Sequence, residues 1–143
     1  KYIEILFNRI NMHIQDLRET VIDDYFTRLN QSDFAGVAEL FAELGCLYPP
    51  FDRKICGREA IHQYLQAEAI GIEALPQSVS LASDRDGETI YHISGQVKTS
   101  LFTVNISWTI ELNADQQIGC VTIKLLAELQ ELLGLDRSRL ATH

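Results

Sequence analysis

Residues 102–112 read FTVNISWTIEL, and this stretch decides the fold class. Apolar side chains occupy every even position from Phe102 to Leu112, and polar side chains occupy every odd position from Thr103 to Glu111. Successive side chains of a β-strand point to opposite faces of the sheet, so this strand has one apolar face and one hydrated face. A strand of this kind is typical of an antiparallel sheet that is covered on one side only. Trp108 lies on the apolar face.

The segments around this strand follow the same two-residue period. Asp86-Gly87 has the residues of a tight hairpin turn, and Asn113-Ala-Asp115 predicts a second turn. Together they predict an antiparallel meander of four strands, at 78–84, 88–100, 102–113 and 117–126.

The N-terminal half has the helical period instead. Apolar residues three and four positions apart predict a helix at 14–30, with Tyr25 and Leu29 on its inward face. Ser32 or Asp33 can cap a short second helix that runs through Phe41. A third helix is predicted at 58–70, with Ile61, Tyr64 and Leu65 facing inward, and a short terminal helix at 128–135.

Between the second and third helices lies GCLYPPF, residues 45–51. Pro49 and Pro50 exclude a helix or a central strand there, so we expect a short strand that leads into a rigid bend. The predicted fold class is therefore α+β, with three N-terminal helices packed on one face of a curved, mainly antiparallel sheet.

Composition limits the partners. The 143 residues are 46% hydrophobic and 22% charged, as expected for one globular domain, and the net charge is −8. An acidic surface repels phosphate backbones, so we expect no nucleic-acid partner. No apolar run approaches the roughly 20 residues of a membrane span. We assign residues 12–143 to the domain and residues 1–11 to an N-terminal extension. The apolar stripe of that extension is expected to prolong the first helix and to pack on the sheet, on a partner subunit or at the mouth of a cavity between the first helix and the sheet.

The three cysteines are Cys46, Cys56 and Cys120. Their odd number and the absence of a C-x-x-C pair predict free thiols in a reducing compartment, here the cytoplasm. Cys46 and Cys56 flank the proline bend, where one of them is either exposed and oxidisable or, as we favour, a small buried apolar group. The spacing of the four histidines matches no metal site.

Tyr25 and Trp108 are the candidate site residues. Each has an apolar body and one hydrogen-bond donor at its tip, and each lies on an inward face. No Asp, Glu, His or Lys is clearly inward on the strands. A cavity with two donors and no base is suited to an acceptor such as a carbonyl oxygen rather than to proton transfer. The alternative is that both are core aromatics whose polar tips are satisfied by backbone or water.

Four segments resemble the C-terminal domain of the cyanobacterial orange carotenoid protein and its stand-alone homologues: VIDDYFTRLNQSDF, LYPPFDRKICGREAI, VNISWTIELN and VTIKLLAELQELL. The resemblance implies a nuclear-transport-factor-2-like cone. It also implies a ketocarotenoid ligand of the canthaxanthin or echinenone type, whose ring carbonyl accepts hydrogen bonds from Tyr25 and Trp108. Leu101 stands where the family has a second tryptophan. The implied apolar tunnel is formed by Leu29, Ile72, Val97, Ile123 and Leu125.

The same resemblance implies a non-enzymatic function. The protein would take a ketocarotenoid from membranes, with transient contact at the thylakoid, deliver it to helical carotenoid proteins, and quench singlet oxygen. Two copies would share one ligand as a homodimer. Two alternatives stay open. One is a ketosteroid-isomerase-like enzyme, which needs an inward carboxylate that Asp23 and Asp24 do not supply. The other is a protein–protein adaptor that uses the hydrated face around Asn105.

Overall fold

The computed structural model describes residues 19–126. Within them the chain forms three helices and six strands. The first helix occupies residues 19–30, and it is followed by α2 (Phe34–Glu39) and α3 (Arg58–Glu68). The strands are β1 (Phe41–Tyr48), β2 (Ile55–Cys56), β3 (Glu73–Arg85), β4 (Glu88–Lys98), β5 (Thr103–Leu112) and β6 (Ile118–Leu125). The predicted extension at 1–11, the start of the helix predicted at 14–30 and the helix predicted at 128–135 lie outside the described residues.

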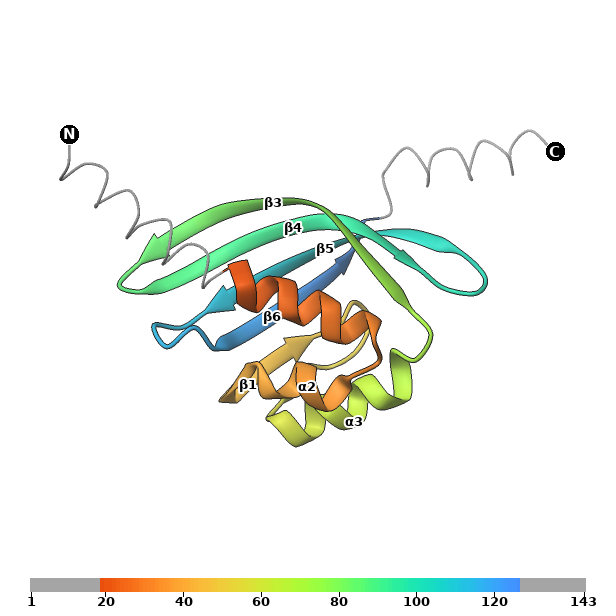
Figure 1. The fold of residues 1–143 in the computed structure, drawn as a ribbon, viewed down its shortest axis with the longest axis horizontal. Coiled ribbons are helices and arrows are strands. Elements are labelled where there is room, and N and C mark those ends of the chain that lie inside the picture. The colour runs from red at the N-terminus through yellow and green to blue at the C-terminus, as the bar shows by residue number, and fades with distance from the viewer. Residues whose placement is uncertain (1–18, 127–143) are drawn as a thin grey trace.

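The six strands form one curved sheet in the order β2-β1-β6-β5-β4-β3. The predicted meander is confirmed for β3 to β6, in which each strand pairs antiparallel with the next. β1 adds to this meander in parallel beside β6, and β2 pairs antiparallel with β1 at the edge. Figure 1 shows the sheet curving around the helices, which all lie on its concave side. The predicted α+β class, with helices on one face of a mainly antiparallel sheet, is confirmed.

Two element boundaries differ from the prediction. α2 ends at Glu39, and Phe41, which was predicted to close that helix, instead opens β1 opposite Ile118. β3 begins at Glu73 rather than at residue 78, although Pro76 lies inside it. Proline is tolerated there because β3 is an edge strand, and the pairing shifts by one residue between Pro76 and Ser78.

Polar side chains fix the helix ends. The Asp33 carboxylate accepts a hydrogen bond from the Gly36 backbone N–H at 3.0 Å and so caps α2, as predicted. At the end of the first helix, the Asn30 side chain both donates to the Ala74 carbonyl at 2.8 Å and accepts from the Ala74 N–H at 2.7 Å. This paired contact ties the first helix to the start of β3 and holds the helix against the sheet.

The alternation in β5 gives the expected two faces. Ile106, Trp108, Ile110 and Leu112 are buried in the core, and their register partners on β4 and β6 are apolar except for Gly95 and the buried Thr89. On the outer face, polar side chains contact their cross-strand neighbours. For example, the Gln96 amide donates to the Asn105 side-chain oxygen at 3.3 Å. The core therefore lies between the concave side of the sheet and the helices.

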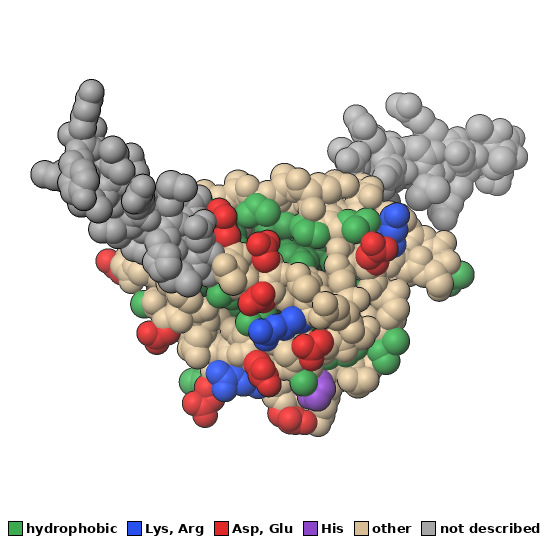
Figure 2. Space-filling model, viewed as in Figure 1, with side chains coloured by type: hydrophobic (Ala, Val, Ile, Leu, Met, Phe, Trp, Pro, Cys, Tyr) green, Lys and Arg blue, Asp and Glu red, His purple; other side chains and the backbone are tan. Residues whose placement is uncertain are grey.

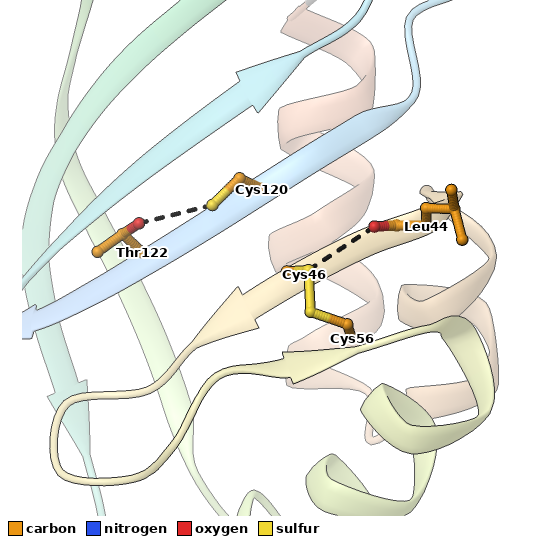
Figure 3. Close-up of a disulfide and its surroundings, with 5 residues drawn as sticks. All are labelled: Leu44, Cys46, Cys56, Cys120 and Thr122. Carbon is orange, nitrogen blue, oxygen red and sulfur yellow. Dashed lines mark hydrogen bonds between the residues drawn. A yellow bond between two sulfur atoms is a disulfide. The ribbon is translucent and has the colours of Figure 1, made fainter.

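The prediction of three free thiols is wrong. Cys46 and Cys56 are joined by a disulfide, with their Cα atoms 4.1 Å apart (Figure 3). The antiparallel register of β1 and β2 places these two residues directly opposite each other, which their spacing along the chain does not reveal. An odd number of cysteines is compatible with one bond plus one free thiol, and Cys120 is that free thiol.

The surface agrees with the acidic composition. Figure 2 shows more Asp and Glu than Lys and Arg side chains over the helical side of the molecule. No helix in residues 19–126 is long and apolar enough to cross a membrane. The same part of the chain contains no group of three His, Cys, Asp or Glu side chains that is arranged to hold a metal ion.

Candidate ligand-binding pocket

A cavity of about 170 Å³ lies between the helices and the concave face of the sheet. The first helix, α3, the end of β1 and the proline bend that follows it contribute to its walls. Its walls are almost entirely apolar. They are formed by Tyr25, Leu29, Leu47, Pro49, Pro50, Tyr64, Leu65, Glu68, Ala69, Ile72, Val97, Ile106, Trp108 and Ile123. Because most of its walls are hydrocarbon, the pocket favours an apolar ligand over water.

Tyr25 and Trp108 both line this pocket, as predicted for the site. Tyr25 lies on the first helix and is 1% exposed, and Trp108 lies in β5 and is 2% exposed. Phe26 contacts both rings edge-to-face, with its centroid 5.1 Å from that of Tyr25 and 4.9 Å from that of Trp108. Such packing fixes ring orientations, so Phe26 holds the two site residues in place.

The polar tips of these two residues lie on side chains that line the cavity. Within residues 19–126, neither the Tyr25 hydroxyl nor the Trp108 indole N–H makes a hydrogen bond to another group. Burial raises the pKa of Tyr25 well above its ordinary value of 10, because ionisation in an apolar environment is unfavourable. The hydroxyl therefore stays protonated and remains a donor at physiological pH. The pocket presents two buried donors that an acceptor atom can satisfy.

The structure brings together most of the residues that were predicted to form the tunnel. Leu29, Ile72, Val97 and Ile123 all line the cavity with Tyr25 and Trp108. Leu125 faces the same side of β6 and packs against the core, but it lies outside the cavity wall.

Leu101 is placed differently from the other predicted residues. It belongs to the hairpin loop between β4 and β5, where its side chain is 86% exposed and does not line the cavity. A loop tip beyond the last paired residues, Lys98 and Thr103, has no core to bury it. A ligand contact at Leu101 stays a prediction.

The wall formed by α3 and the proline bend was not predicted as part of the site. A signal was present, since Tyr64 and Leu65 were expected to face inward and Pro49 and Pro50 were expected to form a rigid bend. What the sequence lacks is the information that α3 packs beside the bend. The Tyr64 hydroxyl makes this connection by donating to the Asp52 carboxylate at 3.2 Å. Burial and that carboxylate raise the pKa of Tyr64 to about 12.

The pocket holds no buried carboxylate among its described lining residues. Glu68 is its one acidic member, and it is exposed on α3. Asp23 is exposed, and Asp24 lies 4.0 Å from Arg28 one helical turn away, so both point away from the pocket as predicted. The arrangement can bind and orient an acceptor, but within residues 19–126 it offers no sequestered base next to Tyr25.

A second hollow of about 400 Å³ lies at the end of the sheet where the β3–β4 and β5–β6 turns meet. It is lined by charged residues of both signs, including Arg85, Glu88 and Glu111. It is larger than the Tyr25–Trp108 pocket, but its described lining contains no aromatic side chain and is far more polar, and its buried Thr89 hydroxyl has no hydrogen-bond partner within residues 19–126. The chemistry favours the smaller, apolar pocket as the ligand site.

Comparison with known proteins identifies the family of the chain. Residues 17–124 match the nuclear transport factor 2 (NTF2) domain. The chain belongs to the NTF2 domain family. Among curated NTF2-domain relatives, it is 32% identical to the orange carotenoid-binding protein of Limnospira maxima over 131 residues, which are 89% of this chain and 41% of that protein. It is also 32% identical to the corresponding protein of Synechocystis sp., over 91% of this chain and 42% of that protein.

Solved structures show the same relationship. The orange carotenoid protein of Anabaena (Nostoc) sp. binding canthaxanthin superposes with a TM-score of 0.72 and 34% identity, over 80% of this chain and 38% of that chain. In these relatives the matched part is the C-terminal domain, so this chain is homologous to that domain. An epoxide hydrolase/cyclase-like enzyme, SalBIII, shares the fold with a TM-score of 0.62 at 17% identity, which is a likeness of fold alone. The chain spans about two fifths of the length of its curated relatives.

Proposed function

We propose that this NTF2-family domain binds a ketocarotenoid of the canthaxanthin or echinenone type and anchors one ring carbonyl between Tyr25 and Trp108. The observation that carries the proposal is that two buried side chains with one donor each, neither of them hydrogen-bonded within residues 19–126, line an otherwise apolar cavity. A carbonyl oxygen has two lone pairs and can accept from both donors at once. The likeness to a carotenoid protein solved with canthaxanthin supports the same ligand class.

The size of the cavity determines how such a ligand fits. Pockets that enclose a drug-sized molecule measure roughly 300–1,000 Å³, whereas this cavity measures about 170 Å³. It therefore holds one end ring, and the polyene leaves through the mouth. Apolar burial at about 25 cal/mol per Å² supplies most of the affinity. The two hydrogen bonds set the position and orientation of the ring.

The part of the polyene that lies outside the cavity must also be shielded from water. Phe51 and Ile70 each follow a lining residue in the chain, and their side chains are 84% and 63% exposed. Leu101, Phe102 and Leu126 are further exposed apolar side chains at strand ends. We infer that these side chains cover the polyene in a homodimer that shares one ligand. They would also support transient contact with membranes during uptake and with helical carotenoid proteins during delivery.

We propose ligand binding rather than catalysis as the function for two reasons. The curated relatives are carotenoid-binding proteins. The candidate pocket, within residues 19–126, offers no buried carboxylate to act as the base of an isomerase. We propose a cytoplasmic carrier that takes up and transfers carotenoid, with quenching of singlet oxygen by the bound pigment.

The proposal is tested by producing the full chain in bacteria that make canthaxanthin. The purified protein should carry the pigment, with an absorption maximum at longer wavelength than the free pigment. Size-exclusion chromatography with absorbance detection should give one pigment for every two chains. A colourless protein that is folded by circular dichroism would overturn the proposal, and one pigment in a monomer would overturn the shared-ligand dimer.

A further inference from the structure

The disulfide lies at the base of the proline bend that forms one wall of the pocket. Cys46 belongs to β1 and Cys56 to β2, and together they close a loop that contains Leu47, Pro49 and Pro50. Figure 3 shows the bend leaving β1 and returning through β2, with the sulfur–sulfur bond joining the two strands. The covalent bond therefore fixes the ends of a segment that contacts the ligand site.

Leu47 and Tyr48 are held by their pairing with Val121 and Thr122 of β6, but few other contacts hold residues 49–56. β2 has only two residues and is the edge of the sheet. The backbone hydrogen bond from Gly57 N–H to the Gly45 carbonyl, at 2.9 Å, lies just beyond the disulfide. The tip of the bend is held by the 3.2 Å hydrogen bond from Tyr64 to Asp52. Residues 50–54 are all exposed. Loss of the disulfide would leave residues 49–56 attached mainly by these contacts and by the pairing of Ile55 with Leu47.

We propose that Cys46 and Cys56 form a reversible redox site that controls access to the pocket. In the oxidised protein the bond holds the bend against the pocket and retains the ligand. In the reduced protein the bend moves more freely, and the ligand enters and leaves faster. The effect on ligand exchange rests on the proposed carotenoid-binding function, whereas the effect on the bend does not.

The exposure of the two residues fits this chemistry. Cys56 is exposed and Cys46 is half-buried, so a small thiol can reach the sulfur of Cys56. The thiolate of that reductant attacks Cys56, a mixed disulfide forms and the sulfur–sulfur bond breaks. The Cys46 thiolate leaves and takes a proton, and its sulfur lies 3.7 Å from the Leu44 carbonyl oxygen, which can accept the new S–H. A second thiol then releases Cys56 as a thiol and forms the external disulfide.

This exchange converts one protein disulfide and two external thiols into two protein thiols and one external disulfide. Two electrons pass from the thiols to the protein. A low-molecular-weight disulfide such as oxidised glutathione reverses the reaction. In a reducing cytoplasm, a protein disulfide is more often a redox-sensing than a permanent bond.

The third cysteine lies beside this pair, and its chemistry explains why the disulfide stays between Cys46 and Cys56. Cys120 of β6 is the register partner of Cys46 on the other side of β1, so the three cysteines occupy adjacent positions on β2, β1 and β6. Burial raises the pKa of the Cys120 thiol, which keeps it protonated and a poor nucleophile at neutral pH. The oxidised protein therefore keeps the Cys46–Cys56 pairing although a third thiol is adjacent.

The first test needs no ligand. The pigment-free chain is equilibrated with oxidised glutathione or with dithiothreitol, separated from the reagent, unfolded in denaturant, alkylated with iodoacetamide and weighed by mass spectrometry. We expect one alkylated cysteine, Cys120, in the oxidised protein and three in the reduced protein. Hydrogen–deuterium exchange should then be faster across 47–57 in the reduced protein and unchanged across β4 and β5. Three reactive thiols under both conditions, or equal exchange in 47–57, would overturn the redox site.

The second test uses the pigment-loaded protein. Transfer of canthaxanthin to liposomes should be about tenfold faster after reduction, since closure of a loop of this length restricts the open bend by at least that factor. The double variant Cys46→Ser/Cys56→Ser should transfer at the fast rate under both conditions, and Cys120→Ser should respond as the wild type does. Equal transfer rates in oxidised and reduced wild type would overturn the control of access. If no pigment is bound at all, only the proposed function fails, because the alkylation and exchange results stand without pigment.

Discussion

Phe26 stands between Tyr25 and Trp108 and contacts both rings edge-to-face, at 5.1 Å and 4.9 Å between centroids. The two residues come from the first helix and from β5, and Phe26 is an aromatic contact that they share. Truncation of Phe26 to Leu would leave both donors present while loosening their rings. Single substitutions at Tyr25 and Trp108 separate the contribution of the hydroxyl from that of the indole N–H.

Trp108→Phe removes the indole N–H and keeps an aromatic ring in the wall. We expect the absorption of bound canthaxanthin to shift to shorter wavelength, because one hydrogen bond to the carbonyl is lost. The affinity should fall by about 1 kcal/mol, the usual value of one neutral hydrogen bond. Thr109→Val, on the hydrated face of the same strand, is the matched control. An unchanged spectrum in Trp108→Phe would remove Trp108 from the anchor.

Tyr25→Phe should have opposite effects on the empty and the loaded protein. The Tyr25 hydroxyl is buried without a partner in residues 19–126, so its removal should leave the stability of the empty protein unchanged or raise it by up to about 1 kcal/mol. The same change should weaken pigment binding. Urea unfolding with and without canthaxanthin measures both effects. A loss of more than about 1 kcal/mol in the empty protein would show that the hydroxyl has a structural partner, contrary to its assigned role.

The dependence of stability on alkaline pH provides an independent test of the burial of the Tyr25 hydroxyl. The pKa of Tyr25 is raised above 10 in the folded protein, so the folded state holds its proton where the unfolded state has lost it. Stability is therefore fully present below about pH 10 and falls as the pH rises from there toward the folded pKa. Tyr64, with a pKa raised to about 12, has the same sign. Urea unfolding at a series of pH values should show a smaller alkaline loss in Tyr25→Phe than in wild type.

The disulfide should contribute measurable stability. It links residues separated by 10 positions, and closure of a loop of this length contributes about 2.5 kcal/mol in the chain-entropy treatment. Reduction should lower the free energy of unfolding by about that amount, and Cys46→Ser/Cys56→Ser should match reduced wild type. If oxidised and reduced wild type unfold at the same urea concentration, the bond has no structural effect on this domain.

Alkaline conditions should also scramble the disulfide. Above the raised pKa of Cys120, its thiolate forms next to Cys46 and can attack the Cys46–Cys56 bond. Peptide mapping of non-reduced protein should then find a Cys46–Cys120 bond that is absent at neutral pH. Persistence of the Cys46–Cys56 bond alone at all pH values would show that the register does not bring the sulfur of Cys120 within reach.

The features that were predictable are those with a local signal. The alternation of 102–112 predicted β5 and its buried face. The inward position of Tyr25 and Trp108 was predicted from the same kind of local signal, and both line the cavity. The features that were not predictable depend on contacts between distant segments. The start of β1 has no alternation and reads as helix, and its parallel partner β6 lies far along the chain. The disulfide likewise follows from register, not from spacing.

The α3 side of the pocket illustrates the same limit. Leu65 and Tyr64 were expected to be inward, but only the packing of α3 beside the proline bend makes them part of the cavity. Leu101 shows the converse, since the family resemblance implied a ligand contact at a position that the structure places on an exposed loop. Whether it contacts a ligand depends on the part of the polyene outside the cavity.

The central claim is that a carbonyl is recognised by Tyr25 and Trp108, and the most direct measurement compares two pigments. The full chain is produced in bacteria that make canthaxanthin and in bacteria that make β-carotene, which has the same polyene and no carbonyl. We predict a coloured protein with canthaxanthin and little or no pigment with β-carotene, and loss of this preference in Tyr25→Phe/Trp108→Phe. Equal loading of the two pigments by the wild-type protein would contradict the account.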